Sequence, residues 1–279
     1  MNFWFRRRCW RRPDTNGRRR IMTMKRFEGR SVIVTGAAGA IGRAIAKRFA
    51  AEGAAVCVSD LKAEGAEAVA EEIRLMDGNA FGCGVDVTQT ADVAAMAERV
   101  LAECGKIDIL VNNAGGSAGL FGRLSRFRDA GEEVWSRVLD LNLHGTLRCI
   151  RAVLNPMIER RYGRIVSIAS IAAAVGILDR VDYSAAKGGI VSLTKALAME
   201  VGGYGVTVNS VSPGAIARRP TDSIPGGTYV GRMGTPEEVA SLVAFLASEE
   251  AAFITGCDYI IDGGRVLGPA RSMETTQHN

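Results

Sequence analysis

Seven short runs of apolar and β-branched residues alternate with longer stretches of helical composition between residues 28 and 266. Strands that are apolar along nearly their whole length need cover on both faces, which a parallel sheet obtains from the helices that connect its strands. The sequence therefore predicts an α/β fold, a doubly wound parallel sheet of seven strands with helices on both faces. The expected strands are 31–35, 54–59, 81–85, 107–112, 164–169, 206–211 and 258–262, and the expected helical stretches include 63–76, 89–104 and 236–248.

The domain organisation follows from a change in charge along the chain. Residues 1–30 hold ten arginines and one lysine against two acidic residues, which gives this segment a charge of +9. Because the net charge of the whole chain is +5, the remaining residues carry −4. We expect a basic, disordered head over 1–27, a single domain over 28–266 and a tail over 267–279. There are two alternative interpretations of the head. It could be a mitochondrial presequence, or it could be translated from upstream of a true start at Met22 or Met24. It lacks the apolar core of a secretion signal.

Charge and apolar patterning also exclude some partners. The acidic body does not extend the basic head into a footprint for nucleic acid. The longest central apolar run, residues 165–178, is too short to span a bilayer. The six cysteines form no CxxC pair, so we expect reduced thiols in a cytoplasmic protein. With only two histidines in the chain, we expect no metal site.

A glycine-rich turn follows the first expected strand, in the run TGAAGAIG at 35–42. Such a turn lets the backbone approach a pyrophosphate, which rests on the N-terminus of the next helix. Asp60 ends the second strand 18 residues after Gly42, near the offset at which an acid meets the ribose 2′-hydroxyl of NAD. An N-cap for the following helix is the alternative for Asp60. Because no Arg or Lys lies between Gly36 and Gly42, we favour NAD over NADP.

These residues resemble the short-chain dehydrogenase/reductase family in its single-domain, Rossmann-like form, over about 28–266. TGAAGAIG is similar to the family's TGxxxGxG turn, with Ala40 where the family has its middle glycine. The runs VDV (85–87), NNAG (112–115), SPG (212–214) and DGG (262–264) are similar to further family motifs. Arg218 stands where the family usually has a threonine that contacts the nicotinamide carboxamide, and Thr221 is a possible replacement. The resemblance implies cofactor contacts from Gly36, Gly39, Ile41, Gly42, Asp60, Leu61, Asp86, Val87, Asn113, Ala114, Gly115, Tyr183, Lys187, Pro213, Gly214 and Ile216.

The catalytic residues that the resemblance implies are Asn142, Ser170, Tyr183 and Lys187. Tyr183 and Lys187 are four residues apart and so share one face of a helix. An adjacent ammonium and the positive charge of oxidised nicotinamide should each favour the phenolate, making Tyr183 the general acid/base. Ser170 would hold the substrate oxygen, and Asn142 would hold a water for proton relay. The expected reaction interconverts a secondary alcohol and a ketone.

Two readings from other classes remain open as alternatives. The run GGSAG (115–119) fits the nucleophile motif of a serine hydrolase, with Ser117 as nucleophile. That class needs a helix directly after the serine and a late histidine, whereas a loop is expected here and His278 lies in the tail. A non-catalytic nucleotide sensor would have no need for the pair formed by Tyr183 and Lys187.

The substrate is expected beside the segments 116–131, 171–182 and 215–233, the last being a mobile cover rich in Gly and Pro. Arg218 and Arg219 could attract a carboxylate. We favour a hydroxysteroid-like or other alicyclic alcohol, with a 3-oxoacyl reductase or a sugar dehydrogenase as alternatives. The resemblance also implies a homotetramer or homodimer, packed through the helical stretches 132–160 and 183–203.

Overall fold

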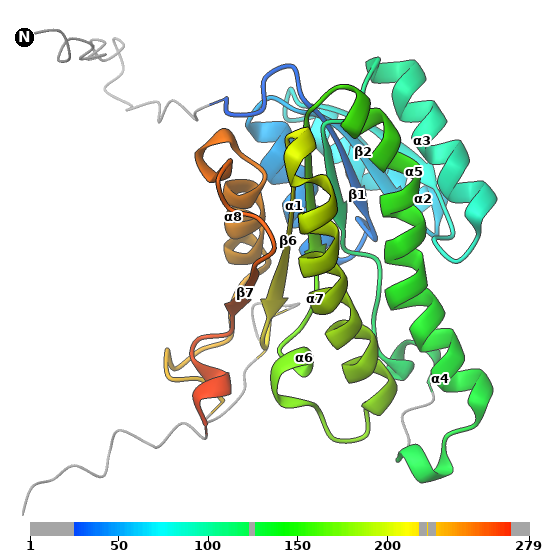
Figure 1. Cartoon of the computed structure of the whole chain (residues 1–279), viewed down its shortest axis with the longest axis vertical. Helices are drawn as coiled ribbons and strands as arrows, with labels where there is room; N and C mark the ends of the chain where they lie inside the picture. Colours follow the sequence, from blue (N-terminus) through cyan, green and yellow to red (C-terminus); the bar gives the residue numbers. More distant parts are fainter. Residues whose placement is uncertain (1–24, 123–125, 218–221, 223–226, 269–279) are drawn as a thin grey trace, which may run out of the picture.

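The computed structural model describes residues 25–122, 126–217, 222 and 227–268. Within them, seven parallel strands form one sheet in the order β3-β2-β1-β4-β5-β6-β7 (Figure 1). The chain starts in the middle of the sheet, builds outward to β3, and then returns to build the other half from β4 to β7. The predicted fold class is confirmed. The strands are β1 Ser31–Thr35, β2 Ala55–Asp60, β3 Asn79–Gly84, β4 Ile109–Asn112, β5 Gly163–Ile168, β6 Val206–Pro213 and β7 Asp258–Ile261.

Two helical layers cover the sheet, each with its own apolar core. The side chains of β1 alternate between them: Val32 and Val34 pack with α1, α2 and α8, and Ile33 packs with α3, α5 and α7. Figure 1 shows α8 on the left and α3 and α5 on the right of the molecule. The helices are α1 Ala40–Ala51, α2 Ala63–Arg74, α3 Thr90–Cys104, α4 Glu132–Leu139, α5 Gly145–Glu159, α6 Ala172–Val175, α7 Val181–Val201 and α8 Pro236–Leu246. Short 3-10 turns are η1 Ala118–Phe121, η2 Phe127–Asp129, η4 Gly202–Tyr204, η5 Glu249–Ala251 and η6 Arg265–Leu267.

The helical stretch expected over 132–160 is interrupted. Between α4 and α5 the chain forms a π-helical turn, η3, at Asp140–His144. A π turn inserts an extra residue into the helix and frequently marks a functional site. Here it contains Asn142, one of the residues implied to be catalytic.

The packed part of the chain begins before the predicted boundary at residue 28. Phe27 is fully buried against Phe49, with ring centres 4.7 Å apart, and Arg26 forms an ion pair with Glu52. The last residues of the predicted head, 26 and 27, are therefore part of the domain. Residues 1–24 and 269–279 lie outside the described residues. No helix in the described part of the chain is both long and apolar enough to cross a bilayer.

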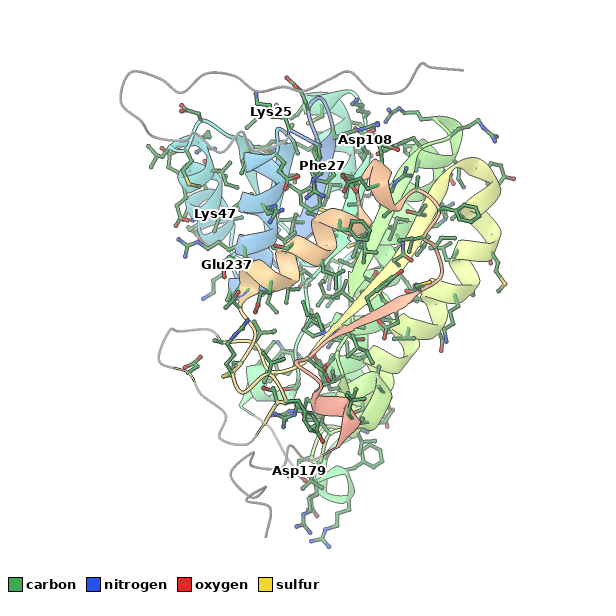
Figure 2. All side chains as sticks on the ribbon, turned by 90° about the vertical axis from the view of Figure 1, so that its left-hand side faces the viewer. Lys25, Phe27, Lys47, Asp108, Asp179 and Glu237 are labelled. Carbon is green, nitrogen blue, oxygen red and sulfur yellow. The ribbon has the colours of Figure 1, made fainter. Side chains whose placement is uncertain are left out.

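Buried charges lie at the amino ends of the strands. The Asp108 carboxylate, fully buried just before β4, accepts a hydrogen bond from the backbone N–H of Ser31 at 3.0 Å. Three cations surround it, with Arg160 at 3.2 Å, Lys106 at 3.4 Å and Arg30 at 3.6 Å. Figure 2 shows Asp108 at one end of the molecule and Asp179 at the other, beyond the carboxyl ends of the strands.

Candidate active site

A cleft of about 800 Å³ opens at the carboxyl ends of the strands, where the strand order reverses between β1 and β4. Reversal points of this kind are where open α/β sheets bind ligands. The cleft lining includes all sixteen residues that the resemblance implied for the cofactor. Ten further residues line it: Ala38, Ala40, Val85, Gly116, Leu120, Leu141, Ile168, Ala169, Ser170 and Ala217. Ser170 was expected as a catalytic residue, and Gly116, Leu120 and Ala217 lie in the segments 116–131 and 215–233 that were expected beside the substrate.

The glycine turn is tight enough to need its glycines. A Cβ placed on Gly42 would lie 2.5 Å from the Gly36 carbonyl oxygen and 2.6 Å from Asn113 Nδ2. Asn113 Nδ2 donates to the carbonyl oxygens of Thr35 and Gly36, both at 2.9 Å, so the turn after β4 braces the turn after β1. Helix α1 starts at this turn without a side-chain cap at Gly39. Its first N–H groups and positive dipole end therefore fit a pyrophosphate.

Asp60 holds the same turn from the other side. Its Oδ2 accepts from the N–H of Ala38 at 3.0 Å, and its Oδ1 accepts from the N–H of Lys62 at 3.4 Å. The alternative role as N-cap is wrong, because α2 starts after Lys62, which has no side-chain cap. The carboxylate thus lines the cleft with a fixed orientation, as ribose recognition requires.

Ser170, Tyr183 and Lys187 converge on one wall of the cleft. Ser170 lies two residues after β5, and the other two come from the first two turns of α7. The Lys187 ammonium donates to the Ile168 carbonyl oxygen at 2.7 Å and lies 5.6 Å from the centre of the Tyr183 ring. The Ser170 hydroxyl is a neighbour of the Tyr183 phenol and lowers its pKa. The expected sharing of one helix face by Tyr183 and Lys187 is therefore present in the structure.

Asn142 lies behind this wall and does not line the cleft. Its amide is fully buried, accepting from the Gly116 N–H at 3.0 Å and donating to the carbonyl oxygens of Gly116 and Val138 at 2.8 Å. A Cβ on Gly115 would lie 2.5 Å from Asn142 Oδ1 and 3.3 Å from Lys187 Nζ. The side chain of Asn142 thus fixes the loop after β4, and the relay water stays a prediction.

Comparison with known proteins agrees with this geometry. A family model described as enoyl-(acyl carrier protein) reductase matches residues 36–265. The 3-oxoacyl-(acyl-carrier-protein) reductase of Escherichia coli is 39% identical over 249 residues, which cover 86% of this chain and 99% of the relative. The D-threitol dehydrogenase of Mycolicibacterium smegmatis is 41% identical over 251 residues, covering 87% and 95%. The short-chain reductase protein NovJ of Streptomyces niveus is 40% identical over 248 residues, covering 84% and 92%.

The chain belongs to the short-chain dehydrogenase/reductase family. It is an oxidoreductase that acts on CH–OH donors with NAD(P). The motif-based identification, the enzyme class and the nucleotide-binding fold are thereby confirmed.

The charges in this dehydrogenase/reductase site differ from the expectation. Burial raises the pKa of Tyr183 above its ordinary value, while the neighbouring Ser170 hydroxyl and the charge of Arg180 lower it. Burial also lowers the pKa of Lys187 to about 8. Lys187 is not among the groups that lower the pKa of Tyr183 in the protein without nicotinamide, so its effect on the phenolate stays a prediction.

The features behind the hydrolase alternative are not assembled in this reductase. The four-residue turn η1 follows Ser117, in place of the long helix that a nucleophile elbow needs. His144 Nδ1 lies 3.3 Å from Asp140 Oδ1 on an exposed part of the π turn. Three further residues singled out from the sequence, Arg218, Arg219 and Thr221, lie outside the described residues.

The cleft residues that sequence reasoning missed adjoin the motifs. Ala38 and Ala40 lie within TGAAGAIG, and Ala169 directly precedes Ser170. Their closeness to these motifs was an available signal. Leu141 carries no such signal, because the π turn brings it to the cleft. Leu120 lies in the segment 116–131 that was expected beside the substrate.

Proposed function

We propose that this enzyme interconverts a secondary alcohol and a ketone, with NAD as its preferred cofactor and Tyr183 as general acid/base. The observation that carries the proposal is the meeting of Ser170, Tyr183 and Lys187 on one wall of the cleft that also holds the glycine turn and Asp60. When bound, the nicotinamide supplies or accepts the hydride.

The chain's own residues position the substrate and move the proton. The hydroxyl of Ser170 holds the substrate oxygen beside the Tyr183 hydroxyl. Because burial favours the neutral phenol, Tyr183 is poised to donate its proton to a carbonyl oxygen during reduction. In the oxidation direction it takes the alcohol proton, with the Lys187 ammonium favouring the phenolate. Asn142 holds the loop after β4 close to Lys187 through its hydrogen bonds to Gly116.

The preference for NAD rests on Asp60. A carboxylate at the ribose end of the cleft repels a 2′-phosphate, and the one cation in the following loop, Lys62, does not line the cleft. Arg43, just after the turn, is paired with Glu72 on the outer surface.

Asp60→Asn tests the preference while keeping an oxygen that can accept from the Ala38 N–H. We expect the ratio of kcat/KM for NADP to that for NAD to rise by about tenfold, since like-charge repulsion is removed. Asp86→Asn, at the adenine end, is the matched control and should leave the ratio unchanged. A wild-type enzyme that prefers NADP would contradict the proposal.

For the substrate, we propose a carbon-rich, neutral secondary alcohol. Leu120 in the cleft wall is 59% exposed. Val175 and Leu178, in the segment 171–182 expected beside the substrate, are 57% and 81% exposed. Exposed apolar side chains beside a site favour an apolar substrate surface. An alicyclic, hydroxysteroid-like alcohol fits this description and remains our first choice.

A 3-oxoacyl reductase is the second candidate, favoured by the 39% identity to the E. coli enzyme. Rates on alicyclic alcohols, polyols such as threitol, and a 3-oxoacyl thioester, each measured with both cofactors, separate the candidates. Fastest turnover of the thioester with NADPH would replace the first proposal by the second.

We also propose a homo-oligomer, a tetramer or a dimer, in the cytoplasm. Leu147 on α5 and Met199 on α7 are exposed apolar residues on the helices expected to pack across two-fold axes. Light scattering at several protein concentrations measures the assembly, and a monomer throughout would contradict it.

A further inference from the structure

Two thiols face the same helical layer from neighbouring strands. Cys57 on β2 is aligned with Phe81 on β3, and Cys83 lies two residues further along β3, so all three side chains point toward α3. The Cys57 and Cys83 side chains pack in the same apolar cluster, and each thiol shifts the pKa of the other. Cys57 is buried, whereas Cys83, on the edge strand, is partly exposed.

Arg99 on α3 packs against β3 near this cysteine pair. Its guanidinium lies 4.9 Å from the centre of the Phe81 ring and donates to the Gly82 carbonyl oxygen at 3.0 Å. The neighbouring Cys57 thiol and Arg99 together lower the pKa of Cys83 to about 6, against opposing effects of burial and Asp92. The pKa of Cys57 is raised instead, by the Cys83 thiol and by burial, so Cys83 is the more readily ionised thiol of the two.

We propose that Cys83 is a site of oxidation by peroxides, with Cys57 as the resolving thiol, and that this oxidation weakens dinucleotide binding. The Cys83 thiolate attacks one peroxide oxygen, the O–O bond breaks, and hydroxide or alkoxide leaves as Cys83 becomes a sulfenic acid. The Cys57 thiol then attacks the Cys83 sulfur; the S–O bond breaks, an S–S bond forms, and water leaves. The two thiols lose two electrons, which the peroxide gains.

The fold links this bond to the cofactor cleft. Diagonal neighbours on adjacent strands have Cα atoms about 7–8 Å apart, whereas a disulfide needs about 4.4–6.8 Å. Bond formation must therefore move the backbone of β2 or β3 at these positions. Asp60 lies three residues after Cys57, and Val85 lies two residues after Cys83, and both line the cleft.

The experiment treats the full-length protein with hydrogen peroxide at about one equivalent per thiol. Peptide mass mapping locates the modification, and fluorescence titration with NADH measures affinity before and after treatment and after dithiothreitol. We expect a Cys57–Cys83 disulfide, an affinity loss of about tenfold, and recovery with the reductant. Mass mapping needs no turnover, so it decides the modification even if the proposed substrate or cofactor preference fails.

Variants assign the roles. Cys83→Ser should retain full NADH affinity after peroxide, and Cys57→Ser should stop at a sulfenic acid that dimedone traps. Cys57→Ala serves in place of Cys57→Ser if the buried hydroxyl impairs folding. Cys257→Ser removes an exposed thiol next to β7 and should behave as wild type. Modification of Cys104 or Cys257 with Cys83 still reduced, or a disulfide that leaves NADH affinity unchanged, would overturn the proposal.

Discussion

The two ends of the parallel sheet bury charge in opposite ways. At the amino ends, the Asp108 carboxylate is surrounded by three cations and a backbone N–H. At the carboxyl ends, the Lys187 ammonium is equally buried, but among the described residues it donates only to the Ile168 carbonyl oxygen and pairs with no carboxylate. A buried charge that is paired with opposite charges maintains structure. A buried charge without such a partner has a shifted pKa, which is typical of residues that take part in proton transfer.

The largest expected effect distinguishes two half-buried tyrosines, Tyr183 at the carboxyl ends of the strands and Tyr162 at the amino ends. Tyr183→Phe should lower kcat by about 1,000-fold, because it removes the proton-transferring hydroxyl, while NADH affinity stays unchanged. Tyr162→Phe is the matched control: that ring lies between Arg30 and Arg164, 3.8 and 4.5 Å from their guanidinium carbons, and should tolerate loss of its hydroxyl without losing activity. Steady-state kinetics measure both. Activity of Tyr183→Phe within tenfold of wild type would refute the assignment.

At the amino end the expected loss is in stability. Asp108→Ala leaves three cations around an empty position and should lower the free energy of unfolding by about 4 kcal/mol. Urea denaturation measures it, and kcat per folded molecule should stay at the wild-type value. Asp108→Asn keeps an acceptor for the Ser31 N–H and should lose less. Equal stability of wild type and Asp108→Ala would remove the distinction between the two ends.

Because the Lys187 ammonium is buried without a carboxylate partner among the residues that the structure describes, we expect the stability of the fold to depend on pH. The pKa of Lys187 is about 8 in the folded protein and about 10.5 when unfolded, so burial of the charged form destabilises the fold below pH 8. Between about pH 8 and 10.5 the unfolded state binds more protons, and stability should rise with pH. Lys187→Met lacks this term. We expect the stability of wild type minus that of the variant to rise by about 3 kcal/mol across this range, and a flat difference would contradict it.

The smallest effect comes from an exposed ion pair at the amino end. Glu250, 55% exposed, lies 3.5 Å from Arg26, which keeps its buried partner Glu52 when Glu250 is changed. Glu250→Gln should alter the free energy of unfolding by less than about 0.5 kcal/mol. A shift in the urea midpoint as large as that of Asp108→Ala would show that pairing, and not burial, governs this end.

Local patterning predicted most of the sheet. Each expected strand overlaps an observed one, because strands buried on both faces have apolar runs that are visible in the sequence. The boundaries were less accurate. β6 extends to Pro213, where it pairs with Ile261 of β7, and β3 starts at Asn79, where it pairs with Ala55 of β2. Pairing with a neighbouring strand fixed these ends, and a polar Asn gives no apolar signal.

The same distinction holds for the site: local motifs predicted some of its features, and others depend on contacts that form only in the folded chain. Motif spacing was enough to select the cleft residues and the pair formed by Tyr183 and Lys187. It could not show that Asn142 bonds to the backbone of Gly116, because that contact depends on a π turn. Nor could it give the direction of the Tyr183 pKa, which depends on how much water the fold excludes. The environment of Asp108 likewise joins residues 30, 106 and 160, which only the folded chain brings together.

The contact of Gly115 with Asn142 and Lys187 limits how this enzyme can be re-engineered. No side chain larger than a hydrogen atom fits at position 115, so a saturation library there should yield almost no active clones. Leu120 lines the same cleft, but it is 59% exposed, so its side chain has more room for variation. Directed evolution toward a new substrate should therefore begin at Leu120 and keep Gly115, Asn142 and Lys187 constant.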